Sequence, residues 1–207
     1  MADRRIVTGS YDTAYARPGP LFGLRPDPAL MELVERFALS GTALDVGAGD
    51  GRHSTYLARH GFRVEAVDIS EQAVEKLREL ARRGRLRIEA RVGDCGDPGC
   101  ISGSWDVIVA DTVLGHFALE AARVIGGRIV EALAPGGWLF VTALAASDPR
   151  ESEFAGLSWT YYTRGQLIAL FPGLRVERCE ELSTVDHTHG QPHRHRVLRL
   201  IAQKEDA

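Results

Sequence analysis

The chain has 207 residues, of which 44% are hydrophobic and 26% charged, with a formal net charge of −3. This length suits one hydrophobic core, so residues 1–207 are expected to form a single domain. Basic and acidic residues are interspersed, which argues against a nucleic-acid partner, and no apolar run approaches the roughly 20 residues that span a bilayer. We therefore expect a soluble, cytoplasmic protein with no membrane partner and leave its oligomeric state open.

Prolines dominate the first thirty residues of the chain. Pro18, Pro20, Pro26 and Pro28 each interrupt regular structure, and a helical pattern begins only afterwards, at ALMELVERFA. Residues 1–30 are therefore predicted to form an irregular N-terminal arm or lid.

Strand and helix patterns alternate after the arm. Strands are predicted at residues 42–47, 62–68, 85–92, 105–111 and 138–144. Helices are predicted at residues 53–60, 71–84 and about 117–133, the last weakened by Gly126-Gly127. Thr163 and Gln166 have the spacing of a capping box, which predicts one further short helix.

The end of the chain breaks this alternation. Two strand patterns, at 174–182 and 193–203, have only a polar segment between them and are predicted to form an antiparallel hairpin. The five preceding strands are linked mainly through helices, which favours parallel pairing. We therefore predict an α/β fold with a doubly wound, mostly parallel seven-stranded sheet that ends in a hairpin.

Three glycines follow the first predicted strand in the segment ALDVGAGDGRH. Gly47, Gly49 and Gly51 permit unusual backbone dihedrals and let a ligand lie against the main chain. Ligands of open parallel sheets bind at the carboxyl ends of the strands, where this loop lies. The dinucleotide fingerprint G-x-G-x-x-G is not met, because its third glycine position is Arg52.

Asp45 precedes these glycines, and the spacing D-x-G-x-G-x-G resembles the first motif of class I methyltransferases that use S-adenosylmethionine. The resemblance implies a Rossmann-like methyltransferase fold, S-adenosylmethionine as cofactor, and Asp45 near its methionine part. It also implies that Asp68, which ends the second strand, accepts both ribose hydroxyls, as an acceptor-only carboxylate can. The alternative for Asp68 is a helix-capping role.

The same resemblance implies further cofactor contacts at other strand ends. Asp94 would meet the adenine amino group, with Cys95 beside the ring, and Ile69 follows Asp68 along the same edge. Asp111 ends the fourth strand and is also expected at the cofactor. The alternative for Asp94 is the formation of a turn.

The run GDGRHSTYLARHGFRVEAVDIS is also similar to the tellurite-resistance type of small methyltransferase, and the similarity extends through LAPGGWLFVTAL. It implies a small-molecule methyl acceptor. Methyl transfer is an in-line displacement on a sulfonium, so the protein must supply alignment and a dry site. A base is needed only if the nucleophile arrives protonated.

Residues near the reacting methyl group are expected from strand ends and from the arm. His116, in ADTVLGHF, is predicted as a substrate-facing base or orienter, with a hydrogen-bonded structural histidine as the alternative. The aromatic faces of Tyr11 and Tyr15 would attract a sulfonium; packing of the arm is the alternative. Arg52 is predicted either to meet a carboxylate or to be solvated.

Four histidines, His187, His189, His193 and His195, fall in DHTHGQPHRHR. His189, His193 or His195 is predicted to close the pocket over an acidic or soft substrate, and His189 and His195 are the leading candidates. A zinc, nickel or iron site is a second possibility for this cluster, and a solvated hairpin is a third. No metal is assigned, since the three cysteines of the chain are scattered and form no C-x-x-C pair.

The leading prediction is therefore an S-adenosylmethionine-dependent methyltransferase that acts on a small molecule. Two other classes stay open. One is a non-catalytic module that binds S-adenosylmethionine or S-adenosylhomocysteine, and the other is a metal-dependent enzyme that uses the C-terminal histidine cluster.

Overall fold

The computed structural model describes residues 4–147, 159–186 and 193–206. One sheet of seven strands, in the order β3-β2-β1-β4-β5-β7-β6, runs through the molecule. The strands are β1 Thr42–Val46, β2 Arg63–Asp68, β3 Ile88–Val92, β4 Trp105–Asp111, β5 Leu133–Leu144, β6 Arg175–Asp186 and β7 His193–Gln203. The helices are α1 Arg4–Tyr15, α2 Pro28–Arg36, α3 Arg52–Arg59, α4 Glu71–Gly84, α5 Leu119–Ala132 and α6 Arg164–Ala169, with a 3-10 turn η1 at Val113–His116.

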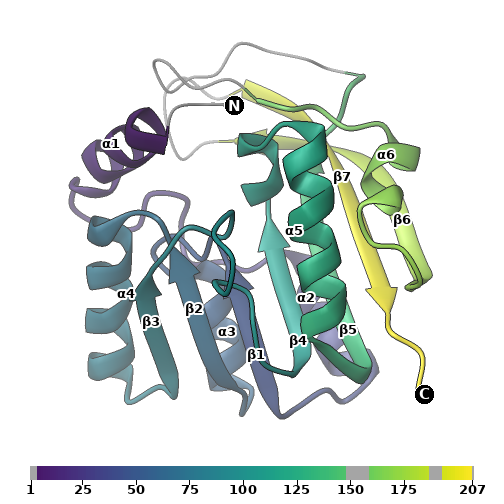
Figure 1. The fold of residues 1–207 in the computed structure, drawn as a ribbon. Helices are drawn as coiled ribbons and strands as arrows, with labels where there is room; N and C mark the ends of the chain where they lie inside the picture. Colours follow the sequence, from purple (N-terminus) through teal and green to yellow (C-terminus); the bar gives the residue numbers. More distant parts are fainter. Residues whose placement is uncertain (1–3, 148–158, 187–192, 207) are drawn as a thin grey trace.

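Strands β1 to β5 are parallel, and β7 is antiparallel to both of its neighbours, β5 and β6. Helices α2, α3 and α4 cover one face of the sheet, and α5 and α6 cover the other (Figure 1). This arrangement confirms the predicted doubly wound sheet with its C-terminal hairpin. The alternating 85–92 segment forms the edge strand β3, and the apolar 105–111 segment forms the central strand β4.

The N-terminal arm differs from the prediction, because Arg4–Tyr15 forms helix α1. The prolines that suggested irregular structure begin only at Pro18, after this helix has ended. Asp12 fixes α1 to the start of α4, since its Oδ1 accepts hydrogen bonds from Ser70 Oγ at 2.6 Å and from Gln72 N at 3.3 Å. The arm is therefore a docked helix beside the carboxyl ends of β2 and β3 (Figure 1).

Helix α5 confirms the helix predicted at about 117–133 and runs unbroken through Gly126-Gly127. A Cβ on Gly126 would collide with the carbonyl oxygen of Leu170, at the end of α6. The glycine therefore allows a close approach between two segments on the same face of the sheet. The predicted capping box is present, because Thr163 and Gln166 bond each other's backbone at the start of α6.

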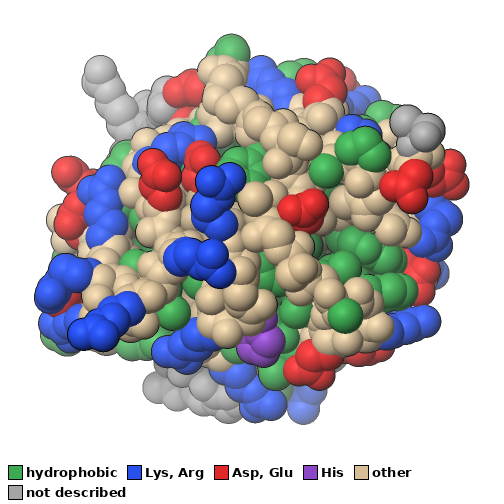
Figure 2. Space-filling model, turned by 90° about the horizontal axis from the view of Figure 1, so that it is seen from below, with side chains coloured by type: hydrophobic (Ala, Val, Ile, Leu, Met, Phe, Trp, Pro, Cys, Tyr) green, Lys and Arg blue, Asp and Glu red, His purple; other side chains and the backbone are tan. Residues whose placement is uncertain are grey.

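The opposite end of the molecule, at the amino ends of the parallel strands, has a mixed surface. Lysine and arginine side chains are scattered there among acidic and apolar ones (Figure 2). Among the residues that the structure describes, no helix combines the length and the apolar character needed to cross a bilayer.

Candidate functional site

A cavity of about 1210 Å³ opens at the carboxyl ends of the parallel strands. Its walls come from the loops after β1, β2, β3 and β4, from the N-terminal arm, and from the β6–β7 hairpin. Protein sites for one small molecule typically enclose roughly 300–1,000 Å³. The cavity is therefore large enough for two ligands side by side.

The glycine loop forms part of this wall through two of its three glycines. Gly47 and Gly49 line the cavity with φ angles of +71° and +54°. A Cβ on Gly49 would collide with the hydroxyl of Tyr15, which the arm places directly over the loop. Gly51 is not on the cavity wall, and a Cβ there would instead collide with Leu77 of α4. The third glycine thus serves packing between helices rather than ligand access.

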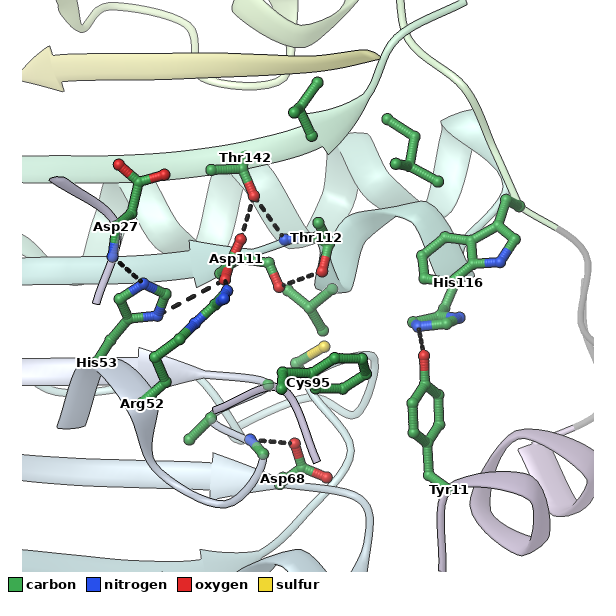
Figure 3. A pocket seen from close by; sticks show the side chains of 18 of the residues that line it. Tyr11, Asp27, Arg52, His53, Asp68, Cys95, Asp111, Thr112, His116 and Thr142 are labelled. Carbon is green, nitrogen blue, oxygen red and sulfur yellow. Dashed lines mark hydrogen bonds and ion pairs between the residues drawn. The ribbon is translucent and has the colours of Figure 1, made fainter. Parts of the chain in front are cut away.

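Asp68 lies beside the loop at the end of β2, where main-chain donors fix its orientation. Its Oδ2 accepts a hydrogen bond from Gly49 N at 2.8 Å, and its Oδ1 accepts one from Ser70 N at 2.9 Å. Burial raises the pKa of Asp68 to about 6. Each oxygen keeps a further lone pair, and Asp68 and Ile69 both line the cavity (Figure 3).

Asp45 is placed differently from the expectation, because its side chain is 1% exposed and does not line the cavity. Its Oδ2 accepts a hydrogen bond from Ser54 Oγ at 2.6 Å, which ties the end of β1 to α3 beneath the glycine loop. Burial raises the pKa of Asp45. Its contact with a bound ligand would therefore be indirect, through the position of the loop.

The residues after β3 line the cavity, and Asp94 uses part of its carboxylate locally. Its Oδ1 accepts a hydrogen bond from Gly96 N at 2.7 Å, which is the turn-forming role considered as the alternative. Cys95 is buried beside it, and burial raises the pKa of the thiol. The thiol is therefore a neutral, apolar part of the wall.

Asp111, at the end of β4, is the centre of a charged cluster that the sequence indicated only in part. Its carboxylate bonds the guanidinium of Arg52 and the hydroxyl of Thr142, and its Oδ2 lies 3.7 Å from His53 Nδ1 (Figure 3). Burial acts to raise the pKa of Asp111, but the charge of Arg52 and these contacts outweigh it and lower the pKa. Arg52 therefore pairs with the carboxylate of Asp111, and of its two expected placements it is not the solvated one.

His53 and Thr142 were missed by sequence reasoning. His53 Nε2 lies 3.3 Å from the backbone nitrogen of Asp27, which can only donate, so the imidazole proton lies on Nδ1, toward Asp111. His53 directly follows Arg52 in the quoted glycine motif, and this adjacency was the available signal. Thr142 ends a strand, but nothing in the sequence pairs it with Asp111.

His116 lies in the cavity wall between two aromatic rings (Figure 3). Its Nε2 is 3.0 Å from the hydroxyl oxygen of Tyr11, and its ring centroid is 4.2 Å from that of Trp159. Burial lowers the pKa of His116 to about 4, so the ring is neutral near pH 7. Its Nδ1 is buried without a hydrogen-bond partner among the described residues.

The tyrosines of α1 occupy the cavity roof above the glycine loop. Tyr11 and Tyr15 stack with ring centroids 6.0 Å apart, and both line the cavity. Burial and the charge of Asp68 raise the pKa of both phenols, so both are protonated. Their rings thus form an uncharged roof.

The histidine cluster is described only in part. His195 lines the cavity from β7, whereas His187 and His189 lie outside the described residues. His193 begins β7, and only its backbone is described. The described part of the chain holds no group of three or more potential metal ligands.

The fold and the site together define a class of protein. A glycine loop after the first strand of a doubly wound sheet, with an acid at the end of the second, is the arrangement of α/β folds that bind nucleotide cofactors. The family profile described as a methyltransferase domain matches residues 43–137, which contain both features.

Known proteins extend this likeness. A 2-heptyl-1-hydroxyquinolin-4(1H)-one methyltransferase of Mycobacteroides abscessus is 28% identical over 159 residues, covering 70% of each chain. Magnesium protoporphyrin IX methyltransferase from Synechocystis PCC 6803, solved with bound S-adenosylhomocysteine, has a TM-score of 0.74 and 18% identity over 98% of this chain and 99% of that one. TehB from Haemophilus influenzae has a TM-score of 0.75 and 20% identity, covering 86% of this chain and 62% of that one.

The chain belongs to the class I S-adenosylmethionine-dependent methyltransferases, and S-adenosylmethionine is its cofactor. The likeness to TehB supports the tellurite-resistance-type resemblance at the level of the fold. The chain spans 70% of the quinolone methyltransferase, but only 32%, 58% and 52% of three other curated relatives. Membership of the family therefore does not identify the methyl acceptor of this chain.

Proposed function

We propose that this protein transfers the methyl group of S-adenosylmethionine to a small-molecule nucleophile by in-line displacement. The observation that carries the proposal is Asp68, whose two carboxylate oxygens are each held by a main-chain N–H beside a bare glycine loop. This is a preformed acceptor for a pair of neighbouring hydroxyls, such as those of a ribose. The hydroxyl of Tyr15 packs directly against Gly49, so the arm and the loop together bound this side of the cavity.

The charged cluster at the end of β4 suits the amino-acid end of the cofactor. That end carries a carboxylate and an ammonium group, and Arg52 and Asp111 offer one charge of each sign at the cavity wall. Of the predicted cofactor residues, Tyr15, Gly47, Gly49, Asp68, Ile69, Asp94, Cys95 and Asp111 line the cavity. We assign Asp45 and Gly51 to support of the loop from beneath.

When bound, the cofactor supplies a methyl group on a positively charged sulfur, which leaves without protonation. The protein then has to hold the acceptor in line and exclude water. His116 is proposed as the residue that orients the acceptor and takes its proton, since it is neutral and lines the cavity. His195 and His189, the latter outside the described residues, are proposed to help close the acceptor side.

A small acceptor is supported by the enclosure of the cavity between the arm and the hairpin. The name of the quinolone methyltransferase points in the same direction. Two other relatives are named for ribosomal RNA and for a ribosomal protein, so these acceptors belong in the test. Basic and acidic residues are interspersed along the sequence, with a net charge of −3, and this supports the smaller acceptor.

The proposal is tested in two stages with purified full-length protein. Calorimetry with S-adenosylhomocysteine should give saturable binding, and labelled S-adenosylmethionine should then pass label to members of a panel of phenols, thiols, selenols and amines. Ribosomal RNA and ribosomal protein serve as macromolecular acceptors. Binding without transfer to any acceptor would identify a non-catalytic binding module, and label on a macromolecule alone would overturn the small-molecule assignment.

A further inference from the structure

The acceptor side of the cavity has a composition different from that of the cofactor side. Its wall is built from Leu144 at the end of β5, Trp159 and Tyr161 before α6, and Leu182 and Val197 in the hairpin. These side chains are flat rings or branched aliphatic groups. Such a wall binds an apolar, flat molecule through burial of surface.

The ring of Trp159 is held in a fixed place above His116. Thr160 N donates a hydrogen bond to Gly115 O at 2.8 Å, and the hydroxyl of Tyr162 donates one to Leu114 O at 2.8 Å. A Cβ on Gly115 would lie 2.5 Å from the Trp159 ring, so the glycine gives the ring its room. Turn η1 and the segment before α6 thus form one rigid aromatic support.

Among the described residues on this side, Arg199 is paired with two carboxylates, and only its Nε lacks a hydrogen-bond partner. Arg199 donates to Asp27 Oδ2 at 2.8 Å and to Glu180 Oε1 at 2.9 Å, and its side chain is only 13% exposed. Arg25 is the remaining guanidinium among the described acceptor-side residues, and it is exposed at the rim. A carboxylate on the acceptor would therefore meet no cation in excess of the carboxylates among these described residues apart from Arg25, and burial of its charge costs several kcal/mol.

The nucleophile can be inferred from His116. In the tautomer with the proton on Nε2, the imidazole donates to Tyr11 Oη, and the buried Nδ1 lone pair needs a hydrogen-bond donor. A thiolate would bring no proton to this position, whereas a hydroxyl would bring one. A hydroxyl that ionises readily fits a neutral imidazole better than an alkyl alcohol does, because this imidazole is a weak base.

We propose that the methyl acceptor is an uncharged, flat molecule with an acidic hydroxyl, a phenol or a ring enol, bound between Trp159 and the β6–β7 hairpin with its hydroxyl at His116. This inference rests on the proposed methyl transfer. The hydroxyl oxygen forms the new bond to carbon as the carbon–sulfur bond breaks and its electron pair stays on sulfur. The hydroxyl proton passes to His116 Nδ1, which holds it as the imidazolium.

Four acceptors that share one ring system test this assignment: 2-naphthol, 6-hydroxy-2-naphthoate, 2-naphthalenethiol and 2-naphthylamine. With labelled S-adenosylmethionine at saturation, we expect kcat/KM for 2-naphthol to exceed that for the hydroxynaphthoate by at least about tenfold, given the cost of an unpaired buried charge. The thiol and the amine should also be poorer acceptors than 2-naphthol. A preference for any of the other three would overturn the proposal and leave methyl transfer standing.

A variant with an added cation sharpens the charge argument. Thr184 is exposed, lies in β6 and lines the cavity, so Thr184→Arg should fold and should reduce the preference for 2-naphthol over the hydroxynaphthoate. Thr184→Gln is the matched control and should leave the ratio unchanged. An unchanged ratio in Thr184→Arg would count against charge selection on this wall. Absence of label in every acceptor despite S-adenosylhomocysteine binding would instead overturn the proposed function, and this inference with it.

Discussion

The two sides of the cavity differ in how the chain builds them. The cofactor side consists of loops that directly follow β1 to β4, and its groups are fixed largely by main-chain contacts such as Gly49 N to Asp68. The acceptor side is assembled from the end of β5, the segment before α6 and the hairpin, which are separate segments of the chain. The cofactor side holds its ligand mainly through groups fixed by the main chain. The acceptor side uses side chains, and substitution of these side chains can alter the choice of acceptor without altering the fold.

The largest expected effect is the loss of cofactor binding when the carboxylate of Asp68 is removed. Asp68→Ala should raise the dissociation constant of S-adenosylhomocysteine by at least about a hundredfold, because it removes acceptors for two hydroxyls worth about 1.5–3 kcal/mol each. Calorimetry measures the change. Glu71→Ala, three residues on and exposed at the start of α4, is the matched control and should bind normally. An unaltered affinity in Asp68→Ala would remove this carboxylate from the cofactor site.

A smaller effect is expected where the arm meets the loop. Gly49→Ala should lower the free energy of unfolding by about 1–2 kcal/mol, because a residue with a side chain is strained at φ +54°. It should also weaken S-adenosylhomocysteine binding, since the new Cβ displaces Tyr15. Thermal unfolding and calorimetry measure the two changes.

Two further variants test the cause of this loss. Tyr15→Phe in the Gly49→Ala background removes the colliding hydroxyl and should restore part of the binding. Gly127→Ala, in a helix where a Cβ meets nothing within 4 Å, should be neutral or stabilising by up to about 1 kcal/mol. If Gly49→Ala binds as well as the unaltered protein, the docked arm is not part of the cofactor site.

The sequence predicted the sheet and the hairpin, and it indicated that the glycine loop and Asp68 lie at the edge where the cavity opens, because these features depend on local signals. Strand periodicity, a glycine loop and an acid at a strand end lie within a few residues of one another. The polar contacts around the cavity join Asp27 to Arg199 and Thr142 to Asp111, and such pairs follow only from the folded arrangement. Sequence periodicity carries no information about them.

Two sequence interpretations treated a pattern as uniform, and the structure places the residues differently. Gly51 shares the spacing of Gly47 and Gly49, yet it faces Leu77 rather than the cavity, because the loop has already turned into α3. The arm was interpreted through its prolines, which begin only after α1 has ended. In both cases the residue types were informative, and the direction of the chain at that position decided their role.

The last prediction concerns pH, which should affect the cofactor side of the cavity more than the acceptor side. Burial raises the pKa of Asp68 to about 6, so its carboxylate is charged at pH 7 and mostly protonated at pH 5. A protonated Asp68 loses acceptor capacity, so S-adenosylhomocysteine affinity should fall by about tenfold between pH 7 and pH 5. His116, with a pKa of about 4, stays mostly neutral over this range, so the acceptor side should contribute little. The control variant Asp68→Asn should bind S-adenosylhomocysteine weakly at both pH values, with no such pH dependence. Circular dichroism at each pH checks that the fold persists. An equally steep pH profile in Asp68→Asn would assign the titration to another group.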